Sequence, residues 1–276
     1  MVFMEYLYAI IAGLIQGLTE FLPVSSSGHL VVLHDFLKFD FIDNLAFDVV
    51  LHLGTFLALL LFFWPEVVKY FKAFFASFFD WNLGHDVNQK MAWYLFAATI
   101  PAALAGYLWQ DLIETVFRST QLVAAMLILV GVILYLADHF SQKIKSLDRL
   151  VFKDALVMGL AQALALIPGV SRSGITIIAG LTQKLNRQAA ARFSFLLSMP
   201  VVFGAGVKKT YDLFVGQGVD LNQFWLLSLG FLAAAISGYY VIKYFLRFLQ
   251  NHSLKVFAYY RVIFGLLLLI ISWHWL

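Results

Sequence analysis

An apolar segment near the N-terminus is interrupted by the stretch Gln16-Gly-Leu-Thr-Glu-Phe-Leu-Pro-Val-Ser-Ser-Ser-Gly-His29. Proline disfavours continuation of a helix, and a serine-rich turn follows where an unbroken membrane helix would be expected. The pattern returns as Pro168-Gly-Val-Ser-Arg-Ser-Gly174. A break at membrane depth is tolerated only where it is buried in protein or lines an aqueous cavity. Each stretch therefore predicts a re-entrant hairpin of helix, loop and helix.

The two interrupted stretches belong to an internal repeat. At an offset of 146 residues, eight of the sixteen positions that begin at Gly13 are identical. The identical pairs are Gly13 and Gly159, Leu14 and Leu160, Gln16 and Gln162, Leu18 and Leu164, Val24 and Val170, Ser25 and Ser171, Ser27 and Ser173, and Gly28 and Gly174. We therefore predict one integral membrane domain, residues 1–276, with a first repeat at about 1–145 and a second at about 146–276.

The composition predicts a membrane protein. Hydrophobic residues make up 62% of the chain and charged residues 13%, and there is no cysteine. Ordinary soluble domains have about 45–50% apolar and about 25% charged residues. Six apolar runs have roughly the 20 residues that a bilayer requires, at 46–64, 91–110, 120–138, 189–208, 223–246 and 256–275. The expected fold is an all-α polytopic membrane protein with six transmembrane helices and two re-entrant hairpins, at 3–38 and 151–184.

The distribution of lysine and arginine favours the re-entrant arrangement. If both hairpins are re-entrant, 13 basic residues lie on one face and 4 on the other, whereas full crossings give 9 against 8. The smaller group of four comprises Lys38, Arg118, Lys208 and Lys209. Because cytoplasmic loops carry an excess of lysine and arginine, we expect inverted repeats with three spans each and both termini outside. Paired broken helices point to a binding site near the midplane.

Side chains that suit phosphate chemistry gather in the two interrupted stretches, residues 16–29 and 168–176. Glu20 lies one helical turn after Gln16, so the two share a face, and a charge inside a membrane segment marks function by default. Arg172 offers paired donors of the kind that phosphate prefers. His29 is a natural proton carrier near neutral pH. Serine-glycine turns at the starts of short helices add backbone N–H groups for an anion. This combination favours phosphoryl chemistry, which depends on positioning and charge neutralisation.

These two motifs carry a family resemblance over essentially the whole chain. They resemble the two signatures of the bacterial undecaprenyl-diphosphatases, also called bacitracin-resistance proteins, and the runs 47–54 and 192–196 fit as well. The resemblance implies hydrolysis of undecaprenyl diphosphate to the monophosphate, which recycles the lipid carrier of cell-wall synthesis. It also implies a bacterial plasma (inner) membrane location and a site that opens to the outer face. The family pattern is commonly Glu-x-x-x-Glu, whereas this chain has Gln16 at the first position.

We expect four catalytic residues, Glu20, Ser26, His29 and Arg172. Arg172 clamps the diphosphate, and Ser26, which occupies the same repeat position, is the favoured nucleophile. A serine hydroxyl needs an adjacent base, which either His29 or Glu20 supplies. Attack by a water activated by Glu20 is the competing mechanism. The expected substrate-binding residues are Ser25, Ser27, Gly28, Ser171, Ser173, Gly174 and Thr176.

A divalent cation, Mg²⁺ or Ca²⁺, held by Glu20 with Gln16 and bridging to the phosphates is a further expectation. The glutamine weakens a two-carboxylate site and leaves Glu20 as the essential acid. We expect no organic cofactor.

Three further features lead to predictions about the surroundings of the site. Asp48 and His52 lie one turn apart, and either steer Glu20 or His29 or form a simple intrahelical pair. Arg261 is expected to extend its side chain to the basic face. Segment 66–80 is expected to be an amphipathic helix in the membrane interface.

Two classes of function remain open from the residues alone. Inverted repeats with broken helices are typical of transporters, so a transporter or flippase of a polyprenyl phosphate is the alternative. The acid, the histidine and the serine favour the phosphatase. The expected partners are a polyprenyl diphosphate and membrane lipid, with no nucleic acid, and the long apolar spans allow a homodimer.

Overall fold

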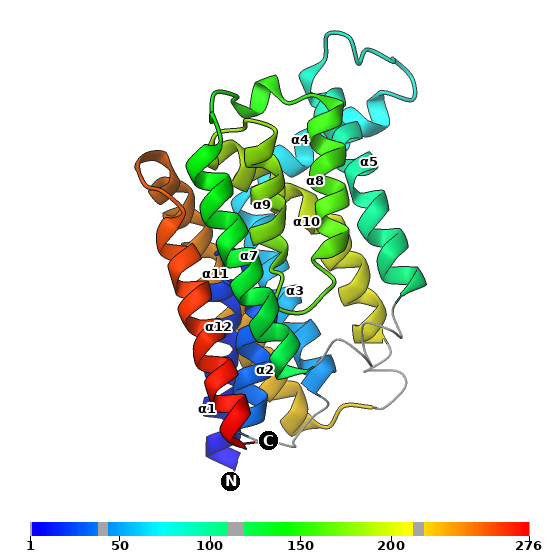
Figure 1. Cartoon of the computed structure of the whole chain (residues 1–276). Helices are drawn as coiled ribbons and strands as arrows, with labels where there is room; N and C mark the ends of the chain where they lie inside the picture. Colours follow the sequence, from blue (N-terminus) through cyan, green and yellow to red (C-terminus); the bar gives the residue numbers. More distant parts are fainter. Residues whose placement is uncertain (1, 38–43, 110–118, 212–217, 276) are drawn as a thin grey trace.

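The computed structural model describes residues 2–37, 44–109, 119–211 and 218–275, and within these ranges the chain is helical (Figure 1). The only β-type pairing in the described ranges is an isolated bridge between Lys145 and Leu185. The elements are α1 (Val2–Glu20), α2 (Ser26–Leu37), α3 (Asn44–Phe62), α4 (Trp64–Ala76), α5 (Val87–Leu108), α7 (Thr120–Phe140), the short 3₁₀ helix η1 (Leu147–Arg149), α8 (Phe152–Leu164), α9 (Arg172–Thr182), α10 (Arg187–Tyr211), α11 (Leu221–Asn251) and α12 (Lys255–Trp275).

The helices fit a polytopic membrane protein. Among the described residues, five helices are long and apolar enough to span a bilayer, or six if the bent pair α3 and α4 counts as one span. A helix covers most of each of the six expected spans, with α11 extending beyond its predicted end to Asn251. The span predicted at 91–110 ends as a helix at Leu108, and residue 110 lies outside the described residues. The span predicted at 46–64 ends earlier, at Phe62, where the chain turns by 83° into α4. The predicted helix at 66–80 is α4, which ends at Ala76 and has no buried residue; its place in the membrane interface stays a prediction.

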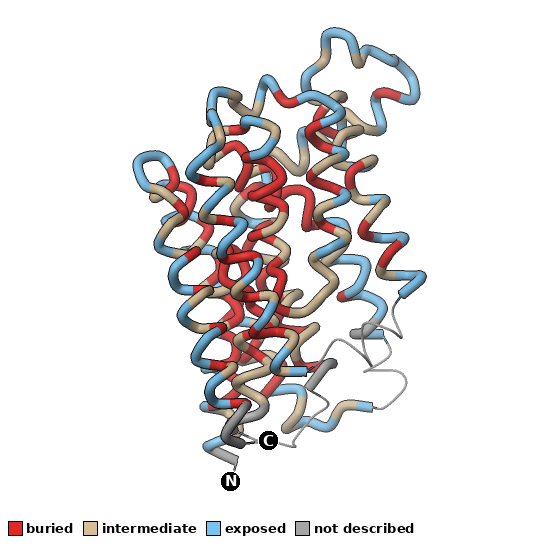
Figure 2. The backbone as a smooth tube through the Cα atoms, viewed as in Figure 1, coloured by how far each residue is buried: buried red, intermediate tan, exposed pale blue. Residues whose placement is uncertain are grey.

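The outer faces of the helices are apolar. Figure 2 shows buried positions gathered on the inward sides and exposed positions along the outer sides. Many of the exposed side chains are large and hydrophobic, among them Leu104, Ile133, Leu232 and Ile263. Apolar surface on this scale would aggregate in water, whereas lipid solvates it at no cost.

Two interrupted helix pairs occupy the interior. Helix α1 is followed by a turn and then α2, and α8 is followed by a turn and then α9, as the two proline-serine stretches predict. Figure 1 shows α8 and α9 reaching inward from one end of the molecule, whereas α1 and α2 lie toward the other end, where both termini are marked. The two regions touch each other, because the Ser173 hydroxyl at the start of α9 donates a 2.9 Å hydrogen bond to the Leu22 carbonyl. We call each turn together with the first residues of the helix that follows, residues 21–28 and 165–174, the first and second tips.

Equivalent glycines let the first helix of each pair approach a long neighbour. A Cβ atom on Gly13 of α1 would lie 2.3 Å from the Gly230 carbonyl oxygen of α11. A Cβ atom on Gly159 of α8 would lie 2.3 Å from the Ala98 carbonyl oxygen of α5. Backbones this close require the missing side chain, so the glycines at one pair of equivalent sequence positions make equally close helix contacts.

The end of the molecule opposite the termini contains the α4–α5, α7–α8, α9–α10 and α11–α12 connections (Figure 1). Arg187 binds both carboxylate oxygens of Asp138, at 2.5 and 3.2 Å. The same carboxylate accepts from the backbone N–H of Leu254, so one buried acid joins three connections. Of the four basic residues expected at the other end, Lys38 and Arg118 lie outside the described residues.

Candidate active site

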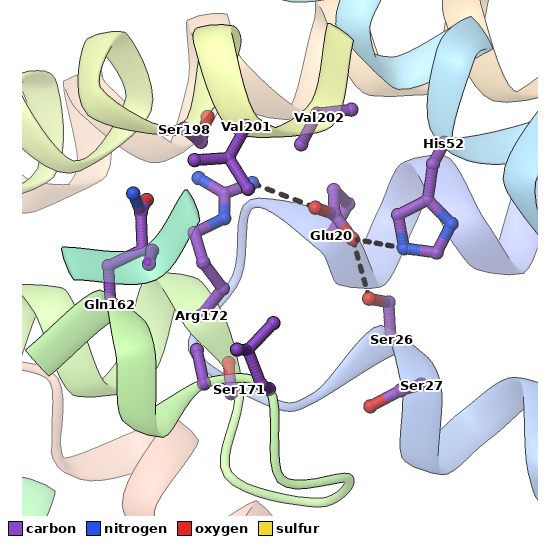
Figure 3. A pocket seen from close by; sticks show the side chains of 13 residues that line it. Glu20, Ser26, Ser27, His52, Gln162, Ser171, Arg172, Ser198, Val201 and Val202 are labelled. Atoms are coloured by element: carbon purple, nitrogen blue, oxygen red, sulfur yellow. Dashed lines mark hydrogen bonds and ion pairs between the residues drawn. The ribbon is translucent and has the colours of Figure 1, made fainter. Parts of the chain in front are cut away.

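Glu20, the last residue of α1, lies at the centre of a buried cluster that joins the two tips. The residue is 8% exposed. Its Oε2 accepts a 2.6 Å hydrogen bond from the Ser26 hydroxyl and a 3.0 Å bond from the Gln16 amide. Its Oε1 accepts a 2.7 Å bond from the Arg172 guanidinium. Figure 3 shows Ser26 and Arg172 reaching the carboxylate from different sides. One acid therefore connects the serine of the first repeat to the arginine of the second.

The first residues of two short helices supply these partners. Ser26 begins α2 and Arg172 begins α9, so both side chains project from helix N-termini that face the same cavity. The positive end of each helix dipole lies there, which favours an anion. Arg172 is half-buried and also donates a 3.4 Å bond to the Ser194 carbonyl. A guanidinium has five N–H donors, and within the described residues only two of its nitrogens are used, so donors remain for a ligand.

The preceding serine has the same strained backbone in each tip. Ser25 and Ser171 both have φ of +72°, which is uncommon for residues other than glycine. Each side-chain oxygen accepts a hydrogen bond from the backbone N–H three residues on, from Gly28 and Gly174 respectively. Each hydroxyl also lies 3.2 Å from the hydroxyl two residues later. The identical sequences Val-Ser-x-Ser-Gly thus form identical turns.

A small cavity of about 170 Å³ opens beside the cluster. Both polar and apolar side chains line it, which suits a charged headgroup attached to a hydrocarbon. The polar lining residues are Glu20, Ser26, Ser27, His52, Gln162, Ser171, Arg172 and Ser198, and the apolar ones are Ala102, Ala165, Leu166, Val201 and Val202.

Only part of the expected substrate-binding set lines this cavity. Ser27 and Ser171 do. Ser173 instead donates to the first tip, and Thr176 shares a 2.6 Å hydrogen bond with Ser194. The N–H groups of the two tip glycines are capped by serine hydroxyls. The contacts of Ser25, Gly28, Ser173, Gly174 and Thr176 with a phosphate remain predictions, and their observed contacts shape the tips.

The structure does not bring His29 into the cluster. Its Nδ1 lies 2.8 Å from the Ser25 carbonyl and its Nε2 lies 2.7 Å from the Tyr260 hydroxyl. Its ring stacks on Phe264 at 4.6 Å between ring centroids. Both ring nitrogens are therefore engaged away from Ser26, and the expected catalytic role of His29 has no support from this geometry.

A different histidine lies beside the acid. The Nε2 atom of His52, on α3, is 3.5 Å from Glu20 Oε2. Its Nδ1 lies 2.7 Å from the Asp48 carbonyl, and since a carbonyl only accepts, Nδ1 carries a hydrogen. Nε2 then either bears a proton shared with Glu20 or faces the carboxylate with a lone pair. Of the two sequence alternatives for His52, contact with Glu20 is the one observed.

Asp48 does not form the side-chain pair with His52 that was the other alternative. Its carboxylate accepts a 2.9 Å bond from His34 Nε2, and the other nitrogen of His34 lies 2.5 Å from the Tyr8 hydroxyl. The sequence does signal a polar position at His52, because it lies on α3 one turn after Asp48. It could not show that the partner of His52 is Glu20, since that depends on how α1 packs against α3.

The structure contradicts the prediction that the Arg261 side chain extends to the basic face. The residue is 0% exposed and does not reach the basic end. Its guanidinium donates 2.8 and 3.1 Å hydrogen bonds to the Gly169 and Val170 carbonyls of the second tip and a 3.2 Å bond to the Pro23 carbonyl of the first. Hydropathy could not reveal this, because the carbonyls come from two turns distant in the sequence.

The donor set does not fit a metal held by the protein alone. The described residues contain no group of three histidine, cysteine or acidic side chains arranged for a metal ion. Gln16 directs its amide nitrogen, not its oxygen, at Glu20. Glu20 Oε2 accepts two hydrogen bonds and Oε1 accepts one, so Oε1 keeps a lone pair that could face a cation. A cation that bridges Glu20 to the phosphates stays a prediction. No step below requires a metal.

The fold and the site together define a multi-pass membrane protein with a buried acid, serine and arginine that meet at the tips of two broken helices. Residues 9–267 match the family of the bacitracin resistance protein BacA. The chain is 44% identical over 259 residues to the undecaprenyl-diphosphatase of Rubrobacter xylanophilus, which covers 94% of this chain and 95% of that protein. It is 41% identical to the undecaprenyl-diphosphatase of Methanosphaera stadtmanae over 98% of this chain and 99% of that one. The corresponding protein of Geotalea daltonii is 42% identical, with coverages of 97% and 98%. The chain therefore belongs to the bacitracin resistance protein BacA family.

Proposed function

We propose that this protein is an integral membrane phosphatase that hydrolyses undecaprenyl diphosphate to undecaprenyl phosphate and inorganic phosphate. The family and the name shared by the relatives support the reaction. Hydrolysis returns the lipid carrier of peptidoglycan and other cell-wall polymers to use. The family description adds bacitracin resistance as the expected consequence.

The observation that carries the proposal is the contact of Glu20 with both Ser26 and Arg172. In the first step Arg172 leaves Glu20 in part and binds the terminal phosphate. Ser26 Oγ attacks the terminal phosphorus and passes its proton to Glu20. The bond from that phosphorus to the bridging oxygen breaks, and undecaprenyl phosphate leaves with the electron pair. A weak nucleophile beside a positioned base is the general arrangement for such a step.

The second step releases phosphate. Glu20, after losing its proton through His52 or water, takes a proton from a water molecule that attacks the phosphoserine. The bond from phosphorus to Ser26 Oγ breaks, the serine regains a proton, and inorganic phosphate leaves. Direct attack on the substrate by water activated by Glu20 is the competing route, and it uses the same acid and the same clamp.

The topology that accompanies this function is two inverted repeats of three spans, each with a re-entrant hairpin. The helix pairs that reach inward from opposite ends support it, as does the expected excess of basic residues on one face. Both termini then lie outside the bacterial plasma membrane, and the cavity opens to the outer face. The substrate approaches from the membrane, and no nucleic acid is involved.

The direct test is phosphate release from undecaprenyl diphosphate by detergent-purified protein. The proposal predicts turnover by the native chain and its loss in Glu20→Ala and Arg172→Ala. Folded protein that releases no phosphate, with Mg²⁺, with Ca²⁺ or with chelator, contradicts it. The paired broken helices favour a lipid transporter as the second candidate. Movement of a labelled polyprenyl phosphate across vesicles, without hydrolysis, supports that alternative.

A further inference from the structure

Arg261 is a buried cation held entirely by backbone carbonyl groups. Within the described residues, every hydrogen-bond acceptor around its guanidinium is a carbonyl oxygen. Besides the bonds to both tips, it donates 3.3 Å bonds to the carbonyls of Met126 and Leu127 on α7. A buried charge at membrane depth is costly, and here all three guanidinium nitrogens donate to backbone carbonyls.

These three acceptors lie in the two turns that follow α1 and α8. Pro23 comes three residues after the end of α1, and Gly169 and Val170 come five and six residues after the end of α8. Buried backbone carbonyls outside a helix need a hydrogen-bond donor from elsewhere. Arg261 supplies donors to both turns at once. Its bonds therefore connect the first tip to the second through a single rigid, planar group.

Each tip thus has two faces with opposite chemistry. Carbonyl groups of the residues just before the serines turn to Arg261, whereas the side chains of Ser26, Ser27, Ser171 and Arg172 turn to the cavity. Arg261 holds the carbonyl faces of the two tips together. The distance between Ser26 and Arg172 on the cavity side therefore depends on Arg261.

We infer that Arg261 is a positioning residue, which sets the distance between the two tips and so aligns Ser26, Glu20 and Arg172 for phosphoryl transfer. It touches neither substrate nor reacting atoms in this arrangement. Its effect reaches the chemistry through the backbone of both tips, and the kinetic part of this inference rests on the proposed phosphatase function.

The packing around Arg261 is tight enough to transmit small shifts. A Cβ atom on Gly131 of α7 would lie 3.1 Å from the Arg261 Cβ. The glycine therefore allows α12 to place the arginine between α7 and the tips. Gly131→Ala keeps the guanidinium but forces it to move by a few tenths of an ångström.

The kinetic experiment compares Arg261→Lys and Gly131→Ala with two controls in the full-length protein. Arg247→Lys changes an exposed arginine of α11, and Gly106→Ala adds a Cβ where no atom lies within 4 Å. Misplacement by about 1 Å can cost about 100-fold in rate. We expect kcat to fall roughly 10- to 100-fold for Arg261→Lys and several-fold for Gly131→Ala. KM should change less than about threefold, because the polyprenyl chain supplies much of the binding energy. Unchanged kcat in both variants overturns the inference.

A second readout does not depend on activity. The chain has no cysteine, so a single introduced thiol reports local opening. Ser173→Cys replaces a residue that is 1% exposed and bridges the tips, and Ser77→Cys replaces one that is 2% exposed at the far end of α4. We expect Arg261→Lys to raise the labelling rate of Ser173→Cys about tenfold by a water-soluble thiol reagent and to leave Ser77→Cys unchanged.

The outcomes separate positioning from general stability. Equal acceleration at both thiols means that the bundle has loosened as a whole, and no acceleration at Ser173→Cys means that Arg261 does not hold the tips. Either result overturns the inference. If the native chain releases no phosphate, the proposed function fails, and the labelling result still decides whether Arg261 joins the tips.

Discussion

The two tips share the backbone turn at their serines and differ in chemistry. Both turn through a serine with φ of +72°, and both cap the following helix with that serine's hydroxyl. At the next position the first tip has Ser26 and the second has Arg172. At the position of Glu20 the second repeat has Leu166. The duplicated scaffold therefore brings two different half-sites to one cavity, with the acid and hydroxyl on one side and the cation on the other.

This difference explains why the site lies between the repeats and in neither one. Phosphoryl transfer needs a nucleophile and a positive clamp on opposite sides of the same phosphorus. Two identical tips would supply two clamps or two hydroxyls. Divergence at a few positions of a shared turn provides both while the packing stays the same. Substitutions at each tip test this difference in side chains.

The largest effect is expected at the first tip. Ser26→Ala should lower the rate of phosphate release by roughly 10⁴-fold or more, because the favoured nucleophile is gone. Ser228→Ala is the matched control, since the Ser228 hydroxyl on α11 donates to the Phe224 carbonyl of its own helix. Mass spectrometry of rapidly quenched native protein should find phosphate on Ser26. Activity above about one-tenth in Ser26→Ala would establish attack by water instead.

Removing the base should cost less. Glu20→Gln keeps the size of the side chain but cannot accept the serine proton, and we expect a loss of about 10²- to 10⁴-fold in kcat. Glu66→Gln makes the same change in an ion pair with Arg192 away from the cavity and should have little effect. Steady-state rates of phosphate release provide the measurement. Equal losses in the two variants would point to a shared structural cause.

The proposed role of the second tip in binding phosphate depends on the planar shape of the Arg172 guanidinium. Arg172→Lys preserves charge but loses the planar pair of donors, so kcat/KM should fall by about 100-fold. Arg192→Lys, the same exchange at the Glu66 ion pair, is the control. A lysine variant at position 172 with native kcat/KM would show that charge alone suffices there.

The shared packing of the repeats predicts matched losses of stability. Gly13→Ala and Gly159→Ala each place a Cβ atom 2.3 Å from a carbonyl oxygen. We expect each to lower the free energy of unfolding by about 1–3 kcal/mol. Gly204→Ala, with no atom within 4 Å of its Cβ, is the control. Thermal unfolding in detergent tests this, and a loss at only one of the two glycines would break the equivalence of the repeats.

The smallest effects should distinguish two histidines. His52→Gln should lower kcat by about tenfold, because His52 lies beside Glu20 and partners of a catalytic group typically contribute on that scale. His29→Gln should stay within about threefold, since its ring nitrogens contact Ser25 and Tyr260. Rates across a range of pH provide the readout. The reverse order would restore His29 as the base.

Local pattern was enough to predict the helices, the two breaks and the equivalence of the tips. Proline and serine-glycine turns act on neighbouring residues, and a duplicated stretch such as Val24–Gly28 folds in the same way twice. Glu20 and Arg172 could be selected because ionisable groups are rare in apolar segments and are retained there for function. Ser26 could be selected because it occupies the repeat position of Arg172.

Tertiary structure alone decided which of these groups meet. The contact of Glu20 with Arg172 joins residues 152 positions apart, and the choice of His52 over His29 depends on how α3 and α12 pack against α1 and α2. Arg261 shows the same limit, because its partners are backbone carbonyls that every sequence possesses. Residue patterns were enough to predict a helical membrane protein and the chemical groups available at the tips. The packing of distant helices decided their partners, because hydrogen bonds depend on positions in space that local patterns do not encode.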